Sequence, residues 1–367
     1  MQQASLRPDM HTPVRAALTF PRLLAGACDS GGGQANDPSA TPRTWAMGFS
    51  PTPPVLTVES VLQGVDAWTP RSEFAVFHEE LPWTDLLAGM LPADILLRDK
   101  SQLVALLRQR GQRLAFMLDL TDGLSRAEEA PQLRTLGRSL AEPAVQQLAR
   151  DYALAVATML EPDLLGLAAE TNLIRLAAPA PIYQAVVTTA NAIAADLEAA
   201  TSPAMKFVSV QVETAWGLLQ AGPFVGIEQD LADFPFAQAI GLSSYPYFVF
   251  GDPADIPDDY YARVLEPTAL PAFVAEGGWS SVDVGGGNGS EEAQARFVGK
   301  QAALLDGIGA IAWLHLLFAD PDLRSWPQPI PSNLPLFTSI GYAHSDFAGK
   351  PALGAWDQQF ARPWSGW

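Results

Sequence analysis

Two apolar runs that each end in a glutamate decide the interpretation of this chain: LLGLAAETN at residues 164–172 and LPAFVAEGGW at residues 270–279. Each run has the composition of a buried strand, with the carboxylate of Glu170 or Glu276 at its end. A carboxylate in that position is costly to desolvate unless the site uses it. Two of them on strands that could converge predict paired acid and base chemistry on a sugar.

From Trp45 onward, short apolar runs alternate with longer amphipathic stretches. The runs predicted to be strands are Trp45–Ser50, Phe74–His78, Arg113–Leu120, Leu164–Glu170, Lys206–Glu213, Ala239–Tyr245, Ala272–Glu276 and Ala310–His315. The stretches predicted to be helices are Ser101–Arg110, Glu142–Leu160, Pro181–Ala199 and Ser290–Asp306. This order predicts a single (β/α)8 TIM barrel over residues 44–367, with its site at the carboxyl ends of the strands. A doubly wound open sheet is the alternative, but the first turn, at residues 47–51, lacks a glycine-rich phosphate sequence.

Alternation within four of the runs places a carboxylate at the end of each predicted inward face. These faces are Ala115, Met117 and Asp119; Gly166, Ala168 and Glu170; Ser209, Gln211 and Glu213; and Ala272, Val274 and Glu276. A barrel interior is narrow and accepts small or polar groups near its mouth. In a competing hypothesis Asp119 and Glu213, rather than Glu170 and Glu276, face each other and catalyse an unrelated reaction.

Several short segments resemble glycoside hydrolase clan A. FVAEGGWSS at residues 273–281 is similar to the nucleophile strand of that clan, GLSSYPY at residues 241–247 looks like its sixth strand, and AGKPALGAW at residues 348–356 resembles its closing helix. Within the clan the resemblance is nearest to the family 53 arabinogalactan endo-β-1,4-galactanases and their uncharacterised relatives. It implies a retaining glycoside hydrolase acting on a β-linked poly- or oligosaccharide, with β-galactan as the first candidate.

The resemblance also implies roles for individual residues. Glu276 is expected to be the nucleophile, Glu170 the acid/base, and Tyr245 a hydrogen-bond donor to the nucleophile. Trp313 is expected to form the floor of the sugar subsite. Apart from the resemblance, further substrate contacts are expected from His78, Asp119, Glu213 and Trp279, whereas a structural role is favoured for His315, on the same face as Trp313.

One position departs from the clan pattern. The clan places Asn directly before its acid/base glutamate, to hold the sugar 2-hydroxyl, and this chain has Ala169 there. Asn172, two residues beyond Glu170, is expected to substitute in part. The departure motivates an alternative function, a non-catalytic carbohydrate-binding barrel lipoprotein.

The composition limits the partners. The 367 residues carry a net charge of −18, which disfavours nucleic acid and anionic membrane surfaces. One cysteine and four scattered histidines show no metal-ligand spacing, so neither a metal nor another cofactor is expected. There is no G-x-S-x-G nucleophile turn. The glycine-rich segment at residues 285–289 is expected to be a flexible loop at the active site, and the protein to be a monomer.

The N-terminal segment suggests a lipid anchor. Small residues precede Cys28, and a Gly, Ser and Asp-rich stretch follows it, as in the cleavage box of bacterial lipoproteins. Residues 1–28 are therefore expected to be a lipoprotein signal segment and residues 29–43 a flexible linker. An extracytoplasmic, membrane-tethered or secreted location follows. An unstructured tail with a chance cysteine is the alternative, since Arg15, Pro21 and Arg22 interrupt the apolar stretch.

Overall fold

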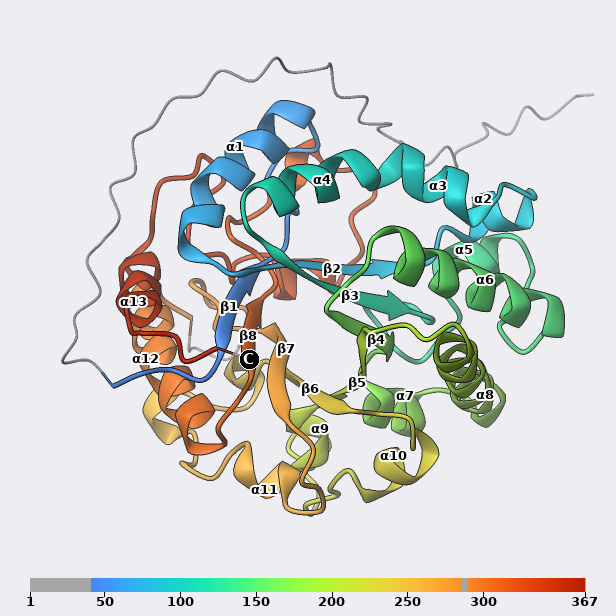
Figure 1. The fold of residues 1–367 in the computed structure, drawn as a ribbon. Coiled ribbons are helices and arrows are strands. Elements are labelled where there is room, and N and C mark those ends of the chain that lie inside the picture. Colours follow the sequence, from blue (N-terminus) through green and yellow to red (C-terminus); the bar gives the residue numbers. More distant parts are fainter. Residues whose placement is uncertain (1–40, 286–288, 367) are drawn as a thin grey trace, which may run out of the picture.

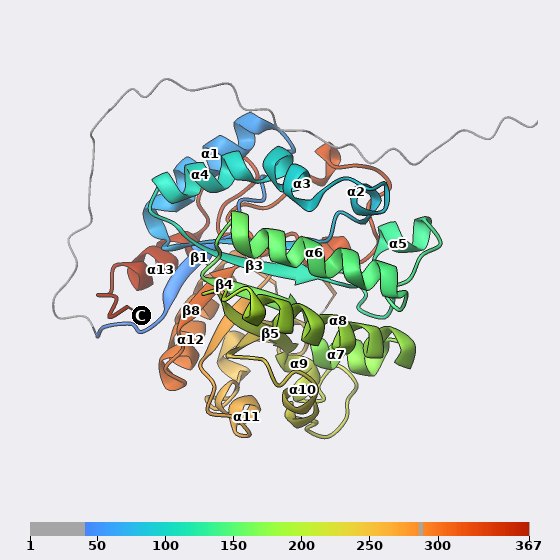
Figure 2. The same ribbon diagram turned by 45° about the vertical axis from the view of Figure 1, so that its right-hand side comes forward.

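The computed structural model describes residues 41–285 and 289–366. Within them, parallel strands close into a barrel in sequence order, and helices surround it (Figures 1 and 2). The strands are β1 (Ala46–Phe49), β2 (Phe74–Glu80), β3 (Arg113–Asp119), β4 (Leu164–Ala168), β5 (Met205–Gln211), β6 (Ala239–Ser244), β7 (Ala272–Gly277) and β8 (Ala312–His315). The predicted (β/α)8 barrel is confirmed.

The helices of the described residues form the outer layer. They are α1 (Val58–Trp68), α2 (Trp83–Leu87), α3 (Pro92–Asp99), α4 (Ser101–Gln109), α5 (Pro131–Thr135), α6 (Pro143–Met159), α7 (Thr171–Ala177), α8 (Ala180–Ala199), α9 (Val212–Ala215), α10 (Glu228–Asp233), α11 (Ala262–Leu265), α12 (Glu291–Gly307) and α13 (Pro351–Phe360). The four predicted helices correspond to α4, α6, α8 and α12. None of the helices in this part of the chain has the length and apolar character needed to cross a bilayer.

Glycines make room for large side chains inside the narrow barrel. A Cβ on Gly48 would lie 2.7 Å from the Cβ of Phe74, and one on Gly166 would lie 2.7 Å from the ring of Phe207. Both distances are far below a normal carbon–carbon contact, so only glycine fits. The interior therefore fills with side chains below the mouth, as is usual for this fold.

Strands β4 and β7 each carry an irregularity just before the glutamate. Pairing of β4 with β5 steps from Gly166 directly to Ala168, and pairing of β6 with β7 passes from Val274 to Glu276. One extra residue in a strand reverses the direction of every side chain after it. Residues on the two sides of such an irregularity therefore no longer share a face in the way that alternation predicts. The predicted inward placement of Ala168, Ala272 and Val274 is wrong, because these residues pack outward against the helices. Both irregularities lie at the end of the barrel where the site is found.

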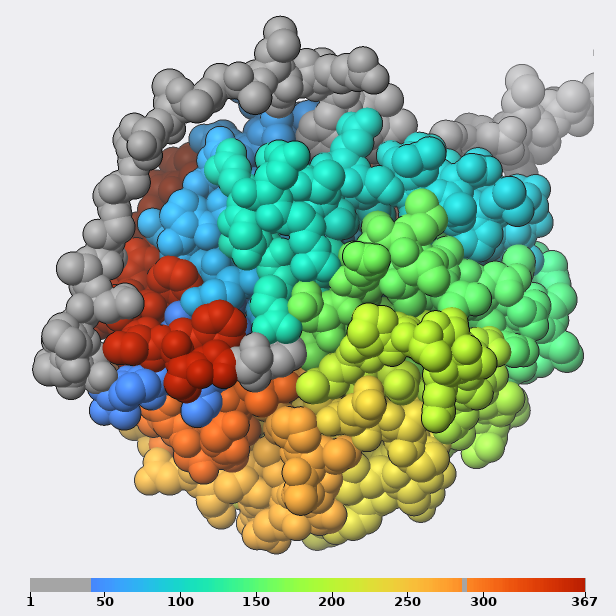
Figure 3. Space-filling model, viewed as in Figure 1, coloured from blue at the N-terminus to red at the C-terminus, as the bar shows by residue number. Residues whose placement is uncertain are grey.

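The two ends of the described chain meet at the opposite end of the barrel from that site. The Arg43 N–H donates to the Pro363 carbonyl at 2.9 Å, and the Ser365 N–H donates to the Arg43 carbonyl at 3.0 Å. Figure 3 shows the blue N-terminal and red C-terminal segments side by side on this face. Arg43 is buried and paired with Glu73, so packed structure begins no later than Arg43.

Other predictions lie outside the described residues. These are the signal segment at residues 1–28 with Cys28, most of the linker at residues 29–43, and the centre of the glycine-rich loop at residues 286–288. The lipid anchor and the extracytoplasmic location stay predictions.

Candidate active site

A cavity of about 660 Å³ opens at the carboxyl ends of the strands. Its polar lining includes both glutamates singled out from the sequence, together with several neighbours. These polar residues are Ser50, Thr52, His78, Glu80, Asp119, Arg126, Glu170, Gln211, Tyr245, Glu276 and Thr338. Within the described residues, no group of three or more His, Cys, Asp or Glu side chains is arranged to hold a metal ion.

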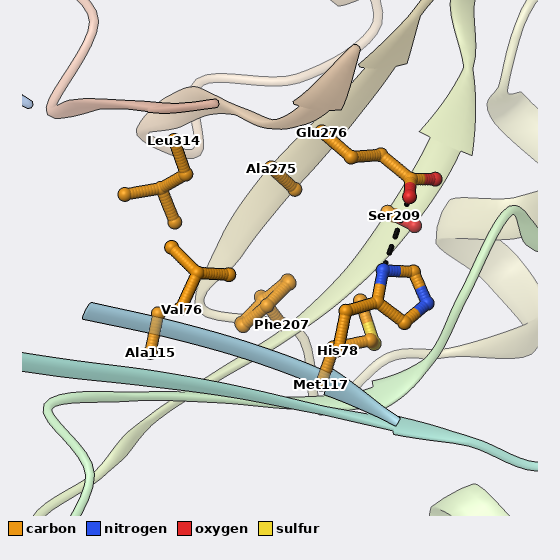
Figure 4. A pocket seen from close by; sticks show the side chains of 9 residues that line it. All are labelled: Val76, His78, Ala115, Met117, Phe207, Ser209, Ala275, Glu276 and Leu314. Carbon is orange, nitrogen blue, oxygen red and sulfur yellow. Dashed lines mark ion pairs between the residues drawn. The ribbon is translucent and has the colours of Figure 1, made fainter. Parts of the chain in front are cut away.

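Glu276, on β7, points toward His78 on β2 (Figure 4). The Nδ1 atom of His78 lies 3.0 Å from Oε2 of Glu276. Burial by itself would raise the pKa of the Glu276 carboxyl, but the charge and hydrogen bond of His78, with the charge of Arg126, hold this pKa below its usual value. Glu276 is therefore the carboxylate that stays ionised.

His78 lies between two acidic side chains. Its Nε2 atom is 3.2 Å from Oδ2 of Asp119, and its Nδ1 atom contacts Glu276. Burial would lower the pKa of this imidazole, yet the two carboxylates raise it to about 10. The ring is consequently an imidazolium that donates from both nitrogens, and it fixes the orientation of the Glu276 side chain.

Glu170 follows β4 in a left-handed backbone conformation, with φ of 45°. The backbone N–H of Glu170 donates a hydrogen bond to the Ser209 hydroxyl at 2.8 Å. Its carboxyl group contacts the Arg126 Nε–H at 2.7 Å and the Ser243 hydroxyl at 2.6 Å. Burial raises the pKa of Glu170, Arg126 opposes this rise, and the charge of Glu276 adds to it, so the pKa stands above its usual value.

Arg126, in the loop after β3, ties the acidic groups together. Its guanidinium is buried and pairs with both Asp119 and Glu170. Arg126 has a φ of 56°, in the same left-handed region as Glu170. The two side chains that pair here therefore both come from strained backbone positions. Such strain concentrates at functional sites. Sequence reasoning missed Arg126 because the loop has no periodicity that would place it.

Ser243 and a mutual charge effect relate the two glutamates. The Ser243 hydroxyl donates to Oε1 of Glu170 at 2.6 Å, and Ser243 is also among the groups that lower the pKa of Glu276. The charge of Glu276 in turn raises the pKa of Glu170, so the two carboxyl groups influence each other within one cavity. Sequence alternation gives Ser243 the inward face of β6, but a serine carries no chemical signature of this role.

Three further residues line the same cavity. Tyr245 is buried, and its phenol pKa is raised by burial and by the charges of Glu276 and Glu170. Gln211 and Glu80 were missed as site residues, although each follows from the alternation of its strand. Glu80 accepts from the Gly123 N–H at 3.2 Å, and burial with the charge of Asp119 raises its pKa to about 7.

Glu213 and Asn172 do not line the cavity. Glu213 is fully buried, and its Oε1 atom accepts from the Tyr245 N–H at 3.0 Å and the Tyr260 hydroxyl at 2.9 Å. The structure therefore does not bring it opposite Asp119, as the competing hypothesis required. Asn172 is also fully buried and exchanges two hydrogen bonds with the backbone of Gln211. It cannot take the place of the side chain that Ala169 lacks.

Trp313 and Trp279 also lie outside the cavity, which corrects the expectation that they contact a sugar, and His315 lies outside it as well. Trp313 is 1% exposed and packs against Trp45, just before β1, and Trp356 of α13, because Leu314 takes the inward position of β8. Trp279 is buried against Tyr247 and Phe297. His315 stacks on Tyr342, and its Nε2 atom lies 2.8 Å from the Ile340 carbonyl oxygen. A shift of one residue in the assumed face of β8 accounts for the positions of Trp313 and His315.

No protein-family model and no curated protein sequence matches this chain. Solved structures do match it. The exo-β-1,4-mannosidase Op5Man5 from Opitutaceae bacterium strain TAV5 has a TM-score of 0.64 and 17% identity, over 92% of this chain and 62% of that one. This chain thus spans less than two thirds of the mannosidase.

Two other matches are covered over more of their length. Xylanase 10B from Thermotoga maritima has a TM-score of 0.56 and 12% identity, over 86% of this chain and 95% of that one. The GH53 catalytic domain from Ignisphaera aggregans has a TM-score of 0.52 and 14% identity, over 71% and 77%. At these identities the similarity shows the fold: this chain shares its barrel with glycoside hydrolases of several families, family 53 among them.

Proposed function

We propose that this protein is a retaining glycoside hydrolase for β-linked sugars, with Glu276 as nucleophile and Glu170 as acid/base. The glycan substrate is a β-linked poly- or oligosaccharide, and β-galactan is the first to test. The neighbours in fold support the general class, because they carry names such as mannosidase and xylanase.

One observation carries the proposal: Glu170 and Glu276 line the same cavity, and their pKa values are displaced in opposite directions. Retaining enzymes place their carboxyl groups about 5–5.5 Å apart, and inverting enzymes about 6.5–9.5 Å apart, so the anomer of the first product tests the retaining assignment. A raised pKa for Glu170 and a lowered one for Glu276 match an acid and a nucleophile.

In the proposed first step the Glu276 carboxylate attacks the anomeric carbon. The glycosidic C–O bond breaks, and its oxygen takes the proton of Glu170, so the leaving group departs as an alcohol. In the second step Glu170, now a carboxylate, removes a proton from water. The resulting hydroxide displaces Glu276 from the anomeric carbon and releases the sugar with its original configuration.

The surrounding residues have supporting roles in this proposal. His78 keeps Glu276 ionised and oriented, and Asp119 keeps His78 charged. Arg126 and Ser243 position Glu170. Gln211, Glu80 and Tyr245 are placed in the lining to contact sugar hydroxyls. A non-catalytic sugar-binding barrel is the second candidate, favoured by Ala169, which supplies no polar side chain before Glu170.

The test is a panel of chromogenic β-glycosides with matched glutamate-to-glutamine variants. We expect Glu276→Gln to abolish hydrolysis while sugar binding persists. We expect Glu170→Gln to lose about 10²–10⁴-fold with poor leaving groups and far less with activated ones, which need no proton. Glu213→Gln, a buried carboxylate outside the cavity, is the control and should retain activity.

Two further readouts decide the mechanism and the alternative. NMR of the first product should show the β-anomer, and the α-anomer would contradict retention. If the wild type binds glycans and hydrolyses none of a broad panel, the non-catalytic function is correct.

A further inference from the structure

The cavity has two kinds of surface. Its floor is polar and contains the two glutamates, whereas its outer side is lined by aliphatic and aromatic side chains, here called the apolar wall. The wall comprises Leu316, Leu317, Trp326, Ile330, Leu334 and Phe337, with prolines between them. All but Leu317 are only half-buried, so the protein leaves apolar surface facing the cavity. Exposed apolar surface concentrated in one concave region indicates a binding site.

The apolar wall belongs to one segment, residues 316–349, between β8 and α13. This segment is hydrogen-bonded to loops from around the barrel mouth. The Asp322 N–H donates to the Pro54 carbonyl after β1 at 2.8 Å, and the Asn333 side chain donates to the Leu124 carbonyl after β3 at 2.7 Å. The Tyr247 hydroxyl, after β6, donates to the Leu336 carbonyl at 2.8 Å.

The segment is therefore anchored at separate points around the rim. These contacts hold the segment against the loops after β1, β3 and β6. At its C-terminal end the segment is fixed by Lys350, whose buried ammonium donates to Asp320, to the Ser281 hydroxyl at 2.9 Å and to the Gly341 carbonyl at 2.9 Å. The wall is accordingly preformed and does not have to be ordered by a ligand.

The chemistry of the wall selects what it binds. A further sugar unit can stack on Trp326 or Phe337, but it would lose hydrogen bonds to water against the four leucine and isoleucine side chains of the wall, which is costly. An apolar group would instead remove both its own surface and that of the wall from water, which is favourable. The polar floor, with its acid and nucleophile, fits the sugar ring.

We propose that the leaving-group side of this site binds an apolar aglycone, so that β-glycosides of hydrophobic alcohols or phenols are better substrates than β-linked oligosaccharides of the same sugar. This inference rests on the proposed function. In the reaction the glycosidic C–O bond breaks, the aglycone oxygen takes the Glu170 proton, and water supplies the hydroxyl of the released sugar. The hydrophobic alcohol leaves from the apolar wall.

The test compares methyl, butyl and hexyl β-glycosides of the sugar that the chromogenic panel selects, with the β-linked disaccharide of that sugar. Alkyl leaving groups have nearly equal basicity, so the series reports chain binding rather than chemical reactivity. We expect kcat/KM to rise by about fourfold for each buried methylene. The hexyl glycoside should exceed the disaccharide. A flat series, or a preferred disaccharide, overturns the inference and leaves the proposed function standing.

Variants locate the effect on the wall. Leu334→Asn and Ile330→Asn should lower the hexyl-to-methyl ratio of kcat/KM by about tenfold, because a polar side chain replaces part of the apolar contact. Leu91→Asn is the matched control, since Leu91 is 64% exposed and does not line the cavity, and it should leave the ratio unchanged. An unchanged ratio in all three variants overturns the inference.

Binding separates the two proposals. Titration calorimetry of the Glu276→Gln variant with methyl and hexyl β-D-galactoside needs no turnover. Tighter binding of the hexyl compound supports the apolar site. If the variant binds the hexyl compound more tightly but the wild type hydrolyses no glycoside, the missing hydrolysis overturns the proposed function and leaves the apolar site standing. Equal affinities for the two compounds overturn the inference.

Discussion

His78 controls the charge of the proposed nucleophile. Its ring bridges Asp119 and Glu276, and a pKa of about 10 keeps it positive across the neutral range. An opposite charge within about 4–6 Å lowers a carboxyl pKa by about 1–3 units. The activity of Glu276 at mildly acidic pH therefore depends on this histidine.

We expect His78→Asn to move the acidic limb of the kcat/KM–pH profile upward by about one unit or more, because Glu276 must be ionised to attack. Profiles of wild type and variant measure this shift. His344→Asn, at a histidine whose side chain is 48% exposed, is the control and should leave the limb in place. An acidic limb that stays unmoved in His78→Asn would contradict the role of this residue.

The same substitution changes how stability depends on pH. The folded-state pKa of His78 is about 10, above its usual 6.5, so its stabilising contribution is fully present below pH 6.5 and is lost as the pH rises toward 10. The free energy of unfolding of the wild type should therefore fall more steeply between pH 7 and 10 than that of His78→Asn, as urea titrations would measure.

At this scale the sequence predicts Asp119, Glu170 and Glu276 correctly as cavity residues, but it places Glu213 there wrongly and misses Glu80. It predicts the partners of these acidic residues poorly. Glu170 and Glu276 are recognisable because each ends an apolar run, and Asp119 follows from alternation along its strand. Arg126 lies in an aperiodic loop, and nothing before folding connects it with Glu170. Trp313 shows the opposite failure: the strand is correct, but the side chain faces the helices.

Among the elements, β7 delivers Glu276 to the site by a local departure from strand geometry. After the register shift, Gly277 has φ of 133°, and the Gly278 N–H donates to the Ser244 carbonyl at 3.0 Å. A Cβ on Gly277 would lie 2.0 Å from the Ser244 carbonyl oxygen. Only glycine allows β7 to end in this way.

We expect Gly277→Ala to lower stability by about 1–3 kcal/mol or more, through overpacking and the unfavourable φ. It should also lower kcat/KM by tenfold or more, since a displacement of about 1 Å at a catalytic group can cost 10²-fold. Gly299→Ala is the control: Gly299 lies within α12 with nothing within 4 Å of the added Cβ, so it should be neutral or stabilising. Equal stability and activity of the two variants would refute this account.

Periodicity located the strands to within a few residues, but it could not locate the irregularities in β4 and β7. An extra residue leaves the composition of a run unchanged and alters only its pairing with a neighbour. The predicted inward faces of these strands therefore failed at Ala168 and Val274, although the glutamates beyond them reach the cavity.

For the whole molecule, closure of the barrel depends on residues far from the cavity. Arg43 is buried, pairs with Glu73, and donates to the Trp45 carbonyl at 2.6 Å. Its backbone also joins Pro363 and Ser365, near the other end of the described chain. These contacts hold the two ends of the chain together, and they lie at the opposite end of the barrel from the site.

We expect Arg43→Ala to lower the free energy of unfolding by about 3–5 kcal/mol, because Glu73 loses its partner in a largely buried pair. The kcat/KM at 25 °C should stay unchanged, because no cavity residue contacts Arg43. Arg110→Ala, which breaks an exposed pair with Asp66, is the control and should cost about 0–1 kcal/mol. Lost activity without lost stability in Arg43→Ala would contradict this division between the two ends.

The number and order of strands predicted the barrel, whereas the path of residues 316–349 along the rim of its mouth was not predicted. Residues 316–349 contain no helical or strand period, and their path depends on hydrogen bonds to Pro54, Leu124 and Tyr247, each far away in the sequence. Tertiary contacts of this kind have no local signature in the amino-acid order.

The apolar wall has a backbone stiffened by Pro321, Pro327, Pro329, Pro331 and Pro335. A stiff backbone does not change its conformation for each ligand, so the wall can fit different ligands only through the rotamers of its aliphatic side chains. Such an enzyme would bind its ligands in order of the apolar surface that they bury, and it would accept ligands of many shapes. New preferences could then arise in evolution by exchanging single leucines or isoleucines on an unchanged scaffold.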